Sequence, residues 1–160
     1  MTLNKIFKNV FLAVVLGFVL SACAQQVKKV DSQIQGDVYT GTDTVEYLAN
    51  GVPDRVFFAT NKSSLTTRSR DTLRKQATYL RKNKDLTVTI EGHADERGTR
   101  EYNLALGERR ANAAKDYLMT YGVSGKRISV ISYGKEKPVN PASSPLAWSQ
   151  NRRSVTIKAN

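Results

Sequence analysis

Residues 90–111, with the sequence IEGHADERGTREYNLALGERRA, contain the transition that decides the fold. Apolar and polar residues alternate over 86–91, which predicts a β-strand that ends at Gly92. A polar loop follows, and the spacing of apolar residues after it predicts a long amphipathic helix over 101–120 that stops before a glycine. A strand, a loop and a helix in this order place charged side chains on a defined frame.

Two of these charged residues suggest a binding site. Asp95 falls on the predicted loop, and Arg110 falls about two to three turns into the helix at ~1.5 Å per residue. An arginine binds a carboxylate with two parallel hydrogen bonds, and an aspartate accepts from an ammonium, so together they would suit a small zwitterion. Spacing leaves an alternative open, in which Arg110 forms an ordinary ion pair on the helix surface. Asn103 is equally compatible with the helix surface and with a clamp on the loop.

The other predicted elements complete a two-layer domain. A dense strand at 55–60 precedes a helix that is capped by Ser63 or Ser64 and extends to Lys82. Further elements are a strand over 127–133, a proline-containing loop over 134–145, a helical turn over 146–153 and a closing strand over 154–159. The order strand, helix, strand, helix, strand, strand predicts an α+β fold with a mixed sheet and both helices on one face.

The N-terminus has the pattern of an export signal. Two lysines precede an apolar run over 10–20, which is shorter than the ~20 residues of a membrane-spanning helix. The residues LSAC at its end resemble the lipobox of bacterial lipoprotein precursors, which predicts a signal peptide over 1–22 and a lipid on Cys23. By the same resemblance, Ala24 favours sorting to the outer membrane. The alternative is an uncleaved signal anchor in which Cys23 is incidental.

A polar segment separates this signal from the domain. Residues 23–50 are rich in Gln, Lys, Asp, Gly and Thr, which is typical of a flexible tether. Val38, Tyr39 and the run 45–48 are apolar points that could dock on the domain, although we interpret them as solvated linker. The folded domain is predicted to span 51–160.

Charge and composition limit the function classes. The formal net charge is +11, and subtracting the two lysines of the signal leaves +9. Such a basic chain raises nucleic acid as a partner. The export signal and the scattered positions of the basic residues argue against it, so we expect no nucleic-acid partner and interpret the charge as attraction to anionic surroundings.

Catalytic signatures are sparse. The chain has one histidine, His93, and one cysteine, with no HExxH, CxxC or GxSxG pattern, so the sequence predicts no metal, no cofactor and no enzyme. We interpret His93 as a structural loop histidine.

A family resemblance adds to this reading. Gly92-His93-Ala94-Asp95, with Gly98, Asn103, Leu106 and Arg110-Ala111, resembles the signature of the OmpA-like C-terminal domain family. The tripeptides Val56-Phe57-Phe58 and Asn151-Arg152-Arg153 and the run 132–138 also resemble that family. The resemblance covers residues 55–160 and implies the same α+β fold.

The resemblance also implies a function. Members hold the diaminopimelate of the peptidoglycan stem peptide, so Asp95 and Arg110 would contact its zwitterionic end. Ala94, Asn103 and Leu106 would line the pocket and Thr60-Asn61 would form the other wall, although this dipeptide departs from the usual Phe-Asp. Lipid-anchored members tether the outer membrane to the cell wall and bind TolB, the periplasmic β-propeller of the Tol system. An envelope enzyme acting on peptidoglycan is the main competing hypothesis, and an anionic-polymer binder driven by charge is another.

Overall fold

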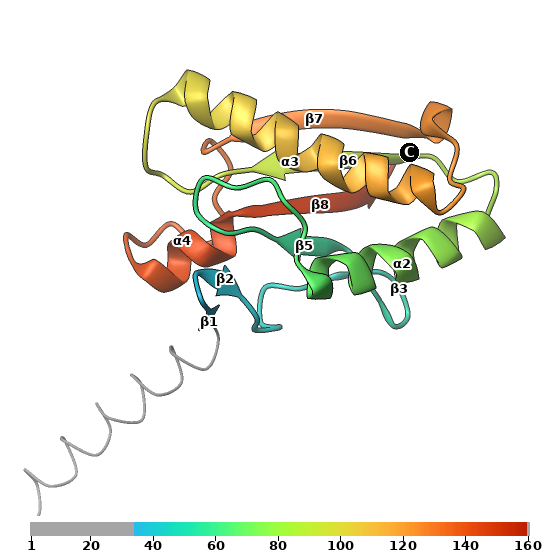
Figure 1. Cartoon of the computed structure of the whole chain (residues 1–160), viewed down its shortest axis with the longest axis horizontal. Helices are drawn as coiled ribbons and strands as arrows, with labels where there is room; N and C mark the ends of the chain where they lie inside the picture. Colours follow the sequence, from blue (N-terminus) through green and yellow to red (C-terminus); the bar gives the residue numbers. More distant parts are fainter. Residues whose placement is uncertain (1–33, 160) are drawn as a thin grey trace, which may run out of the picture. The chain divides into compact units, whose positions relative to one another are not determined.

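A four-stranded mixed sheet forms the centre of the computed structural model, which describes residues 34–159 (Figure 1). In spatial order the strands are β5 (Arg55–Phe57), β8 (Arg153–Lys158), β6 (Val88–His93) and β7 (Ile128–Gly134). β8 runs antiparallel to both of its neighbours, whereas β6 and β7 are parallel. The parallel pair requires a crossover connection, which a helix supplies.

Two helices cover one face of this sheet (Figure 1). They are α2 (Thr67–Lys82) and α3 (Arg100–Thr120), and each is capped by the threonine that precedes it. The first helix therefore starts later than predicted, because Thr66 and not Ser63 or Ser64 accepts the orphan N–H of Ser69. A 3-10 turn, Gly125–Arg127, and a short helix, α4 (Pro145–Asn151), complete this part of the chain. From β5 onward the predicted element order is confirmed, and so is the α+β class.

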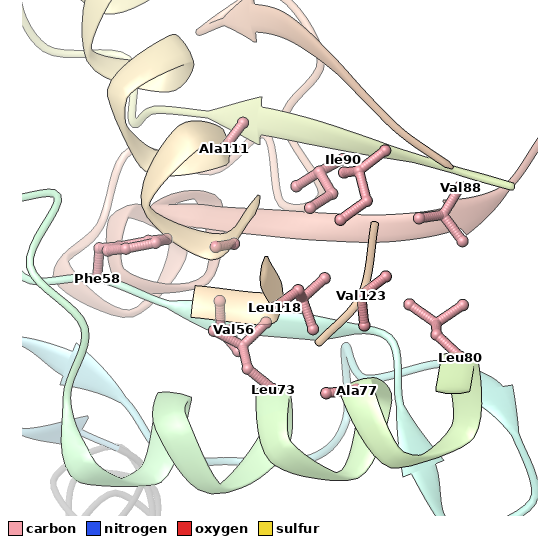
Figure 2. Close-up of a cluster of buried hydrophobic side chains, with 12 residues drawn as sticks. Val56, Phe58, Leu73, Ala77, Leu80, Val88, Ile90, Ala111, Leu118 and Val123 are labelled. Carbon is pink, nitrogen blue, oxygen red and sulfur yellow. The ribbon is translucent and has the colours of Figure 1, made fainter. Parts of the chain in front are cut away.

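The core lies between the helices and the sheet (Figure 2). α2 contributes the predicted apolar stripe of Leu73, Ala77 and Leu80, and β6 contributes Val88 and Ile90. All five side chains are buried. At ~1.5–3 kcal/mol for each large apolar side chain removed from water, this layer is the main source of stability of the frame that carries the site.

Two glycines bring α3 against β6. A Cβ atom on Gly92 would lie 1.8 Å from the carbonyl oxygen of Gly107, which no side chain tolerates. A Cβ on Gly107 would lie 2.3 Å from Ser132 Oγ. Backbone contact between helix and strand fixes the start of α3 relative to the end of β6, and so fixes both ends of the loop between them.

Residues 34–50 belong to the domain, so the predicted tether is wrong for this part. Two small strand pairs form here, β1 (Ile34–Gln35) with β2 (Val38–Tyr39), and β3 (Tyr47–Ala49) with β4 (Val52–Pro53). Tyr39 is 1% exposed and its ring lies 4.8 Å from that of Phe57, while Leu48 is also buried. A few apolar residues are sufficient to dock this polar segment on the domain, because their side chains become buried there.

The predicted signal peptide, Cys23 and the first part of the tether lie outside the described residues. Among the helices of residues 34–159, none combines the length and apolar character that crossing a membrane would require.

Candidate functional site

The loop between β6 and α3 presents the candidate site and is fixed at both ends. The N–H of Ala94 donates to the carbonyl of Gly134 at 2.7 Å, which ties the start of the loop to β7. The Nδ2 atom of Asn103 donates to the carbonyl of Arg97 at 2.8 Å, which ties the end of the loop to α3. Gly98 between them has φ +91°, a value that favours glycine. Of the two roles predicted for Asn103, on the helix surface or as a clamp on the loop, the structure shows the clamp.

Asp95 is the buried acid of this loop, with 5% of its surface exposed. Its Oδ1 accepts from the N–H and the Nε of Arg97, both at 3.1 Å. Its Oδ2 accepts from Arg97 Nη2 at 2.6 Å and from Arg152 Nη1 at 3.2 Å. Burial alone would raise the pKa of Asp95, but the hydrogen bonds from Arg97 and Arg152 outweigh burial and hold this pKa below its usual value. The carboxylate is therefore ionised at neutral pH.

Arg97 reaches Asp95 from the solvent side. Its side chain is 42% exposed, and its guanidinium carbon lies 4.4 Å from the centre of the Trp148 ring. The indole N–H of Trp148 in turn donates to Glu96 Oε1 at 2.8 Å. The same guanidinium has a long contact of 3.4 Å to the hydroxyl of Thr60.

Arg152 and Asp37 extend the charged cluster toward the N-terminal segment. Arg152 donates to the carbonyl oxygens of Phe58 and Asp37 as well as to Asp95, and its side chain is 4% exposed. The Oδ2 atom of Asp37 accepts from the N–H of Thr60 at 2.5 Å. Thr60 thus contacts both Asp37 and Arg97 beside Asp95, and Asp37 supplies a second carboxylate. The role of Thr60 as a wall of the pocket stays a prediction.

Arg110 lies inside the domain with no exposed surface. Its guanidinium donates to the carbonyl oxygens of Lys62 (2.9 Å), His93 (2.8 Å) and Ala59 (3.0 Å). Burial is the main reason that the pKa of Arg110 falls to about 10, and the charge of Asp95 raises it in part. The alternative in which Arg110 forms an ion pair on the helix surface is therefore wrong, because Arg110 is buried and bonds to backbone carbonyls. Arg110 is not bonded to Asp95 but lies within electrostatic range of that acid, and its contact with a zwitterionic ligand stays a prediction.

Of the other predicted site residues, two are buried and one is exposed. Leu106 and Ala94 are buried, each 3% exposed, and pack within the domain. Asn61 is exposed, with φ 54° at the turn after β5. Arg97, Arg152 and Asp37 were not among the predicted site residues. Arg152 had a signal in the Asn151-Arg152-Arg153 motif, but no sequence spacing connects that motif with Asp95.

His93 lies on the sheet face away from α3. Gly92 faces α3, and successive strand residues point to opposite faces, so the side chain of His93 points away from α3. Its ring packs against that of Tyr133, with 5.6 Å between the two ring centres. It is 1% exposed, and burial together with the charges of Arg153, Lys137 and Arg55 lowers its pKa to about 3. The imidazole is neutral and enclosed, as a structural histidine is, but the prediction that His93 lies on the loop is wrong, because it is the last residue of β6.

No group of three or more metal-ligating side chains occurs within residues 34–159. A cavity of about 410 Å³ lies between the N-terminal segment, β5 and the start of α2, and none of the predicted site residues lines it. The chemistry available around Asp95 is charge recognition: one ionised carboxylate, a second one nearby and three guanidinium groups.

The charged loop is thus carried by a two-layer α+β domain. Residues 57–152 match the OmpA family, and the chain belongs to this family. A peptidoglycan-associated lipoprotein of Rhizobium meliloti is 46% identical over 153 residues, which are 92% of this chain and 86% of that protein. The corresponding protein of Brucella melitensis is 52% identical over 106 residues, 66% of this chain and 63% of that one.

Solved structures of related proteins have the same fold as this domain. The crystal structure of the peptidoglycan-associated lipoprotein from Burkholderia pseudomallei has a TM-score of 0.65 and 37% identity, and the match covers 66% of this chain and 90% of that chain. The C-terminal domain of Helicobacter pylori MotB has a TM-score of 0.62 over 67% of this chain and 84% of that chain. With 21% identity, the MotB likeness concerns the fold alone.

Proposed function

We propose that this chain is a non-catalytic lipoprotein of the outer membrane that binds peptidoglycan and so tethers the membrane to the cell wall. The observation that carries the proposal is Asp95, a loop carboxylate kept ionised among guanidinium groups. The names of the relatives, which are peptidoglycan-associated lipoproteins, support the same ligand.

The ligand group is the free end of diaminopimelate, with an ammonium and a carboxylate on one carbon. Asp95 accepts from the ammonium. Arg110 has five N–H donors, and its hydrogen bonds to three backbone carbonyls leave two of them for the ligand carboxylate. Because Arg110 has no exposed surface, the carboxylate reaches these two donors only when the side chains that cover them move aside. Arg110 also links Ala59 and Lys62, on the wall after β5, to the end of β6 that precedes Asp95. Thr60 and Asn61 form that wall.

The test is binding of the full chain, purified in detergent, to isolated peptidoglycan sacculi. Asp95→Asn keeps the shape of the side chain and removes its charge, and we expect it to lose most of the binding. Asp85→Asn is the matched control, because Asp85 is an exposed acid away from the site, and it should bind normally. Retained binding by the Asp95 variant would refute the assignment of this site.

A soluble stem tripeptide that ends in diaminopimelate tests the ligand chemistry. The same tripeptide with lysine in that position has the ammonium and lacks the carboxylate. We expect the lysine peptide to bind about tenfold or more weakly, since a charge-assisted, bidentate hydrogen bond is worth ~1.5–3 kcal/mol. Equal affinity would show that bulk charge, and not this recognition, drives the binding, and such binding would also collapse with salt.

The anchor and the partner complete the proposal. Cys23 carries the lipid, so Cys23→Ala should abolish the incorporation of labelled palmitate into the protein. Within the Tol-Pal system, the partner is the periplasmic β-propeller TolB, and a pull-down with and without soluble peptidoglycan would measure their competition. Release of muropeptides from sacculi that disappears in His93→Gln would instead support the competing enzyme. The burial of His93 speaks against that outcome.

A further inference from the structure

Arg97 occupies the oxygen atoms that the proposed ligand requires. Its Nε and Nη2 atoms lie 3.1 Å and 2.6 Å from the two oxygens of Asp95, in the bidentate arrangement typical of a strong arginine–carboxylate pair. The N–H of Arg97 and Nη1 of Arg152 take up further lone pairs. An ammonium can therefore reach Asp95 only where one of these donors leaves.

Arg97 is the donor that is able to leave. Arg152 is buried and bonded to three acceptors on three segments, so its movement would open the domain. The Arg97 side chain is 42% exposed and is bonded only within the site. Its backbone stays in place because Asn103 holds its carbonyl, so the side chain can swing without disturbing the loop.

A second position for the Arg97 guanidinium lies beside the first. The hydroxyl of Thr60 is 3.4 Å from Nη2, and the N–H of Thr60 is bonded to the carboxylate of Asp37. The charge of Asp37 already acts favourably on Arg97. A guanidinium that leaves Asp95 in this direction keeps a carboxylate partner, which lowers the cost of its displacement.

We propose that Arg97 is an internal competitor of the ligand: its guanidinium holds the ammonium position on Asp95 until ligand binds, and then moves to Thr60 and Asp37. This inference rests on the proposed function, since it concerns the same site. It assigns Arg97 a positioning role that sets affinity and excludes weak cations, in contrast to a residue that contacts the ligand.

The test measures affinity of the full chain for the diaminopimelate tripeptide by titration calorimetry. Arg97→Gln keeps much of the length and polarity of the side chain and removes its charge. We expect binding to become about two- to fivefold tighter, equivalent to ~0.4–1 kcal/mol, the range of a solvent-exposed ion pair. Arg100→Gln is the matched control, because Arg100 is exposed at the start of α3, and it should leave affinity unchanged.

A blocked ligand isolates the ammonium. When the distal amine of the tripeptide is acetylated, Arg97→Gln should give no gain, because no ammonium then competes for Asp95. Weaker or unchanged binding of the unmodified tripeptide by Arg97→Gln would overturn the inference, the former because Arg97 would be a direct contact. In that case a loss of binding in Asp95→Asn would still uphold the proposed site, whereas retained binding in Asp95→Asn would refute the site itself.

An independent measurement follows the guanidinium directly. The side-chain Nε–H signal of Arg97, assigned by its loss in Arg97→Gln, should shift when the tripeptide is added to the wild-type chain. It should shift much less with the acetylated tripeptide. A signal that does not respond to the unmodified peptide would mean that the ion pair with Asp95 persists in the complex, and the inference would be wrong.

Discussion

Replacement of Arg110 by alanine should destabilise the domain severely, because this arginine joins three segments. Its guanidinium donates to the carbonyls of Ala59, Lys62 and His93 from a fully buried position. A hydrogen bond from a charged group is worth ~1.5–3 kcal/mol, and each carbonyl left without a donor costs ~1–3 kcal/mol.

The net loss is smaller than the sum of these terms. Water can enter the space and satisfy some of the carbonyls, and the cost of keeping a buried charge disappears, as the lowered pKa of Arg110 indicates. We therefore expect Arg110→Ala to lower the free energy of unfolding by about 3–5 kcal/mol, which is a large part of the ~5–15 kcal/mol that stabilises a typical domain. Arg110→Lys should recover little, since an ammonium does not span three acceptors.

Urea unfolding of the full chain, followed by the fluorescence of its single tryptophan, Trp148, measures this loss. Arg109→Ala is the control, because Arg109 is the exposed neighbour on the same helix and should change stability by less than ~0.5 kcal/mol. A loss below ~1 kcal/mol for Arg110→Ala would refute the structural role. A loss near the expected value means that any binding defect of an Arg110 variant has to be corrected for its folded fraction.

Three further predictions test the frame of the site. The pKa of His93 is about 3 in the folded chain and about 6.5 in the unfolded chain, so the unfolded chain binds a proton first and the domain loses stability as pH falls below about 6.5. Between pH 7 and pH 4.5 this titration should lower the free energy of unfolding by ~2–3 kcal/mol. In urea titrations at the two pH values, His93→Gln should lack this part of the decrease. Gly92→Ala should cost ~3 kcal/mol or more, and more than Gly107→Ala. The nearest backbone atom to a new Cβ lies at 1.8 Å for Gly92 and at 2.9 Å for Gly107, whose closest clash is with the hydroxyl of Ser132; equal thermal stabilities of the two variants would contradict this difference. Tyr39→Ala should cost ~3 kcal/mol, whereas Tyr47→Ala, at a position 60% exposed, should be nearly neutral; similar unfolding midpoints would mean that residues 34–50 are not docked.

The sequence was sufficient for the fold because its elements follow local patterns. Alternation over β6, the stripe of α2 and the glycine after α3 each depend on a few neighbouring residues, and the structure bears them out. The docking of residues 34–50 could not be predicted in this way. It depends on Tyr39 meeting Phe57, two residues that are close only after the sheet has formed.

The candidate site also depends on contacts between residues that are far apart in the sequence, and these contacts could not be predicted. The pattern singled out Asp95 correctly as a loop acid, yet it could not tell which of the neighbouring arginines would be paired with it. Arg97 is two residues away and Arg152 is 57 residues away, and both bond to Asp95, while Arg110 does not. Charge is visible in a sequence, but the burial that decides its role belongs to the folded packing.

The three arginines near Asp95 differ in freedom, and this difference assigns their roles. Arg110 is fully buried and fixed to backbone carbonyls, so it holds the walls together. Arg152 is nearly as enclosed and ties Asp95 to the N-terminal segment at Asp37. Only Arg97 couples strong pairing to solvent exposure. An exchange of cations at Asp95 therefore has to proceed through Arg97, since moving either of the other two would cost the domain several buried hydrogen bonds.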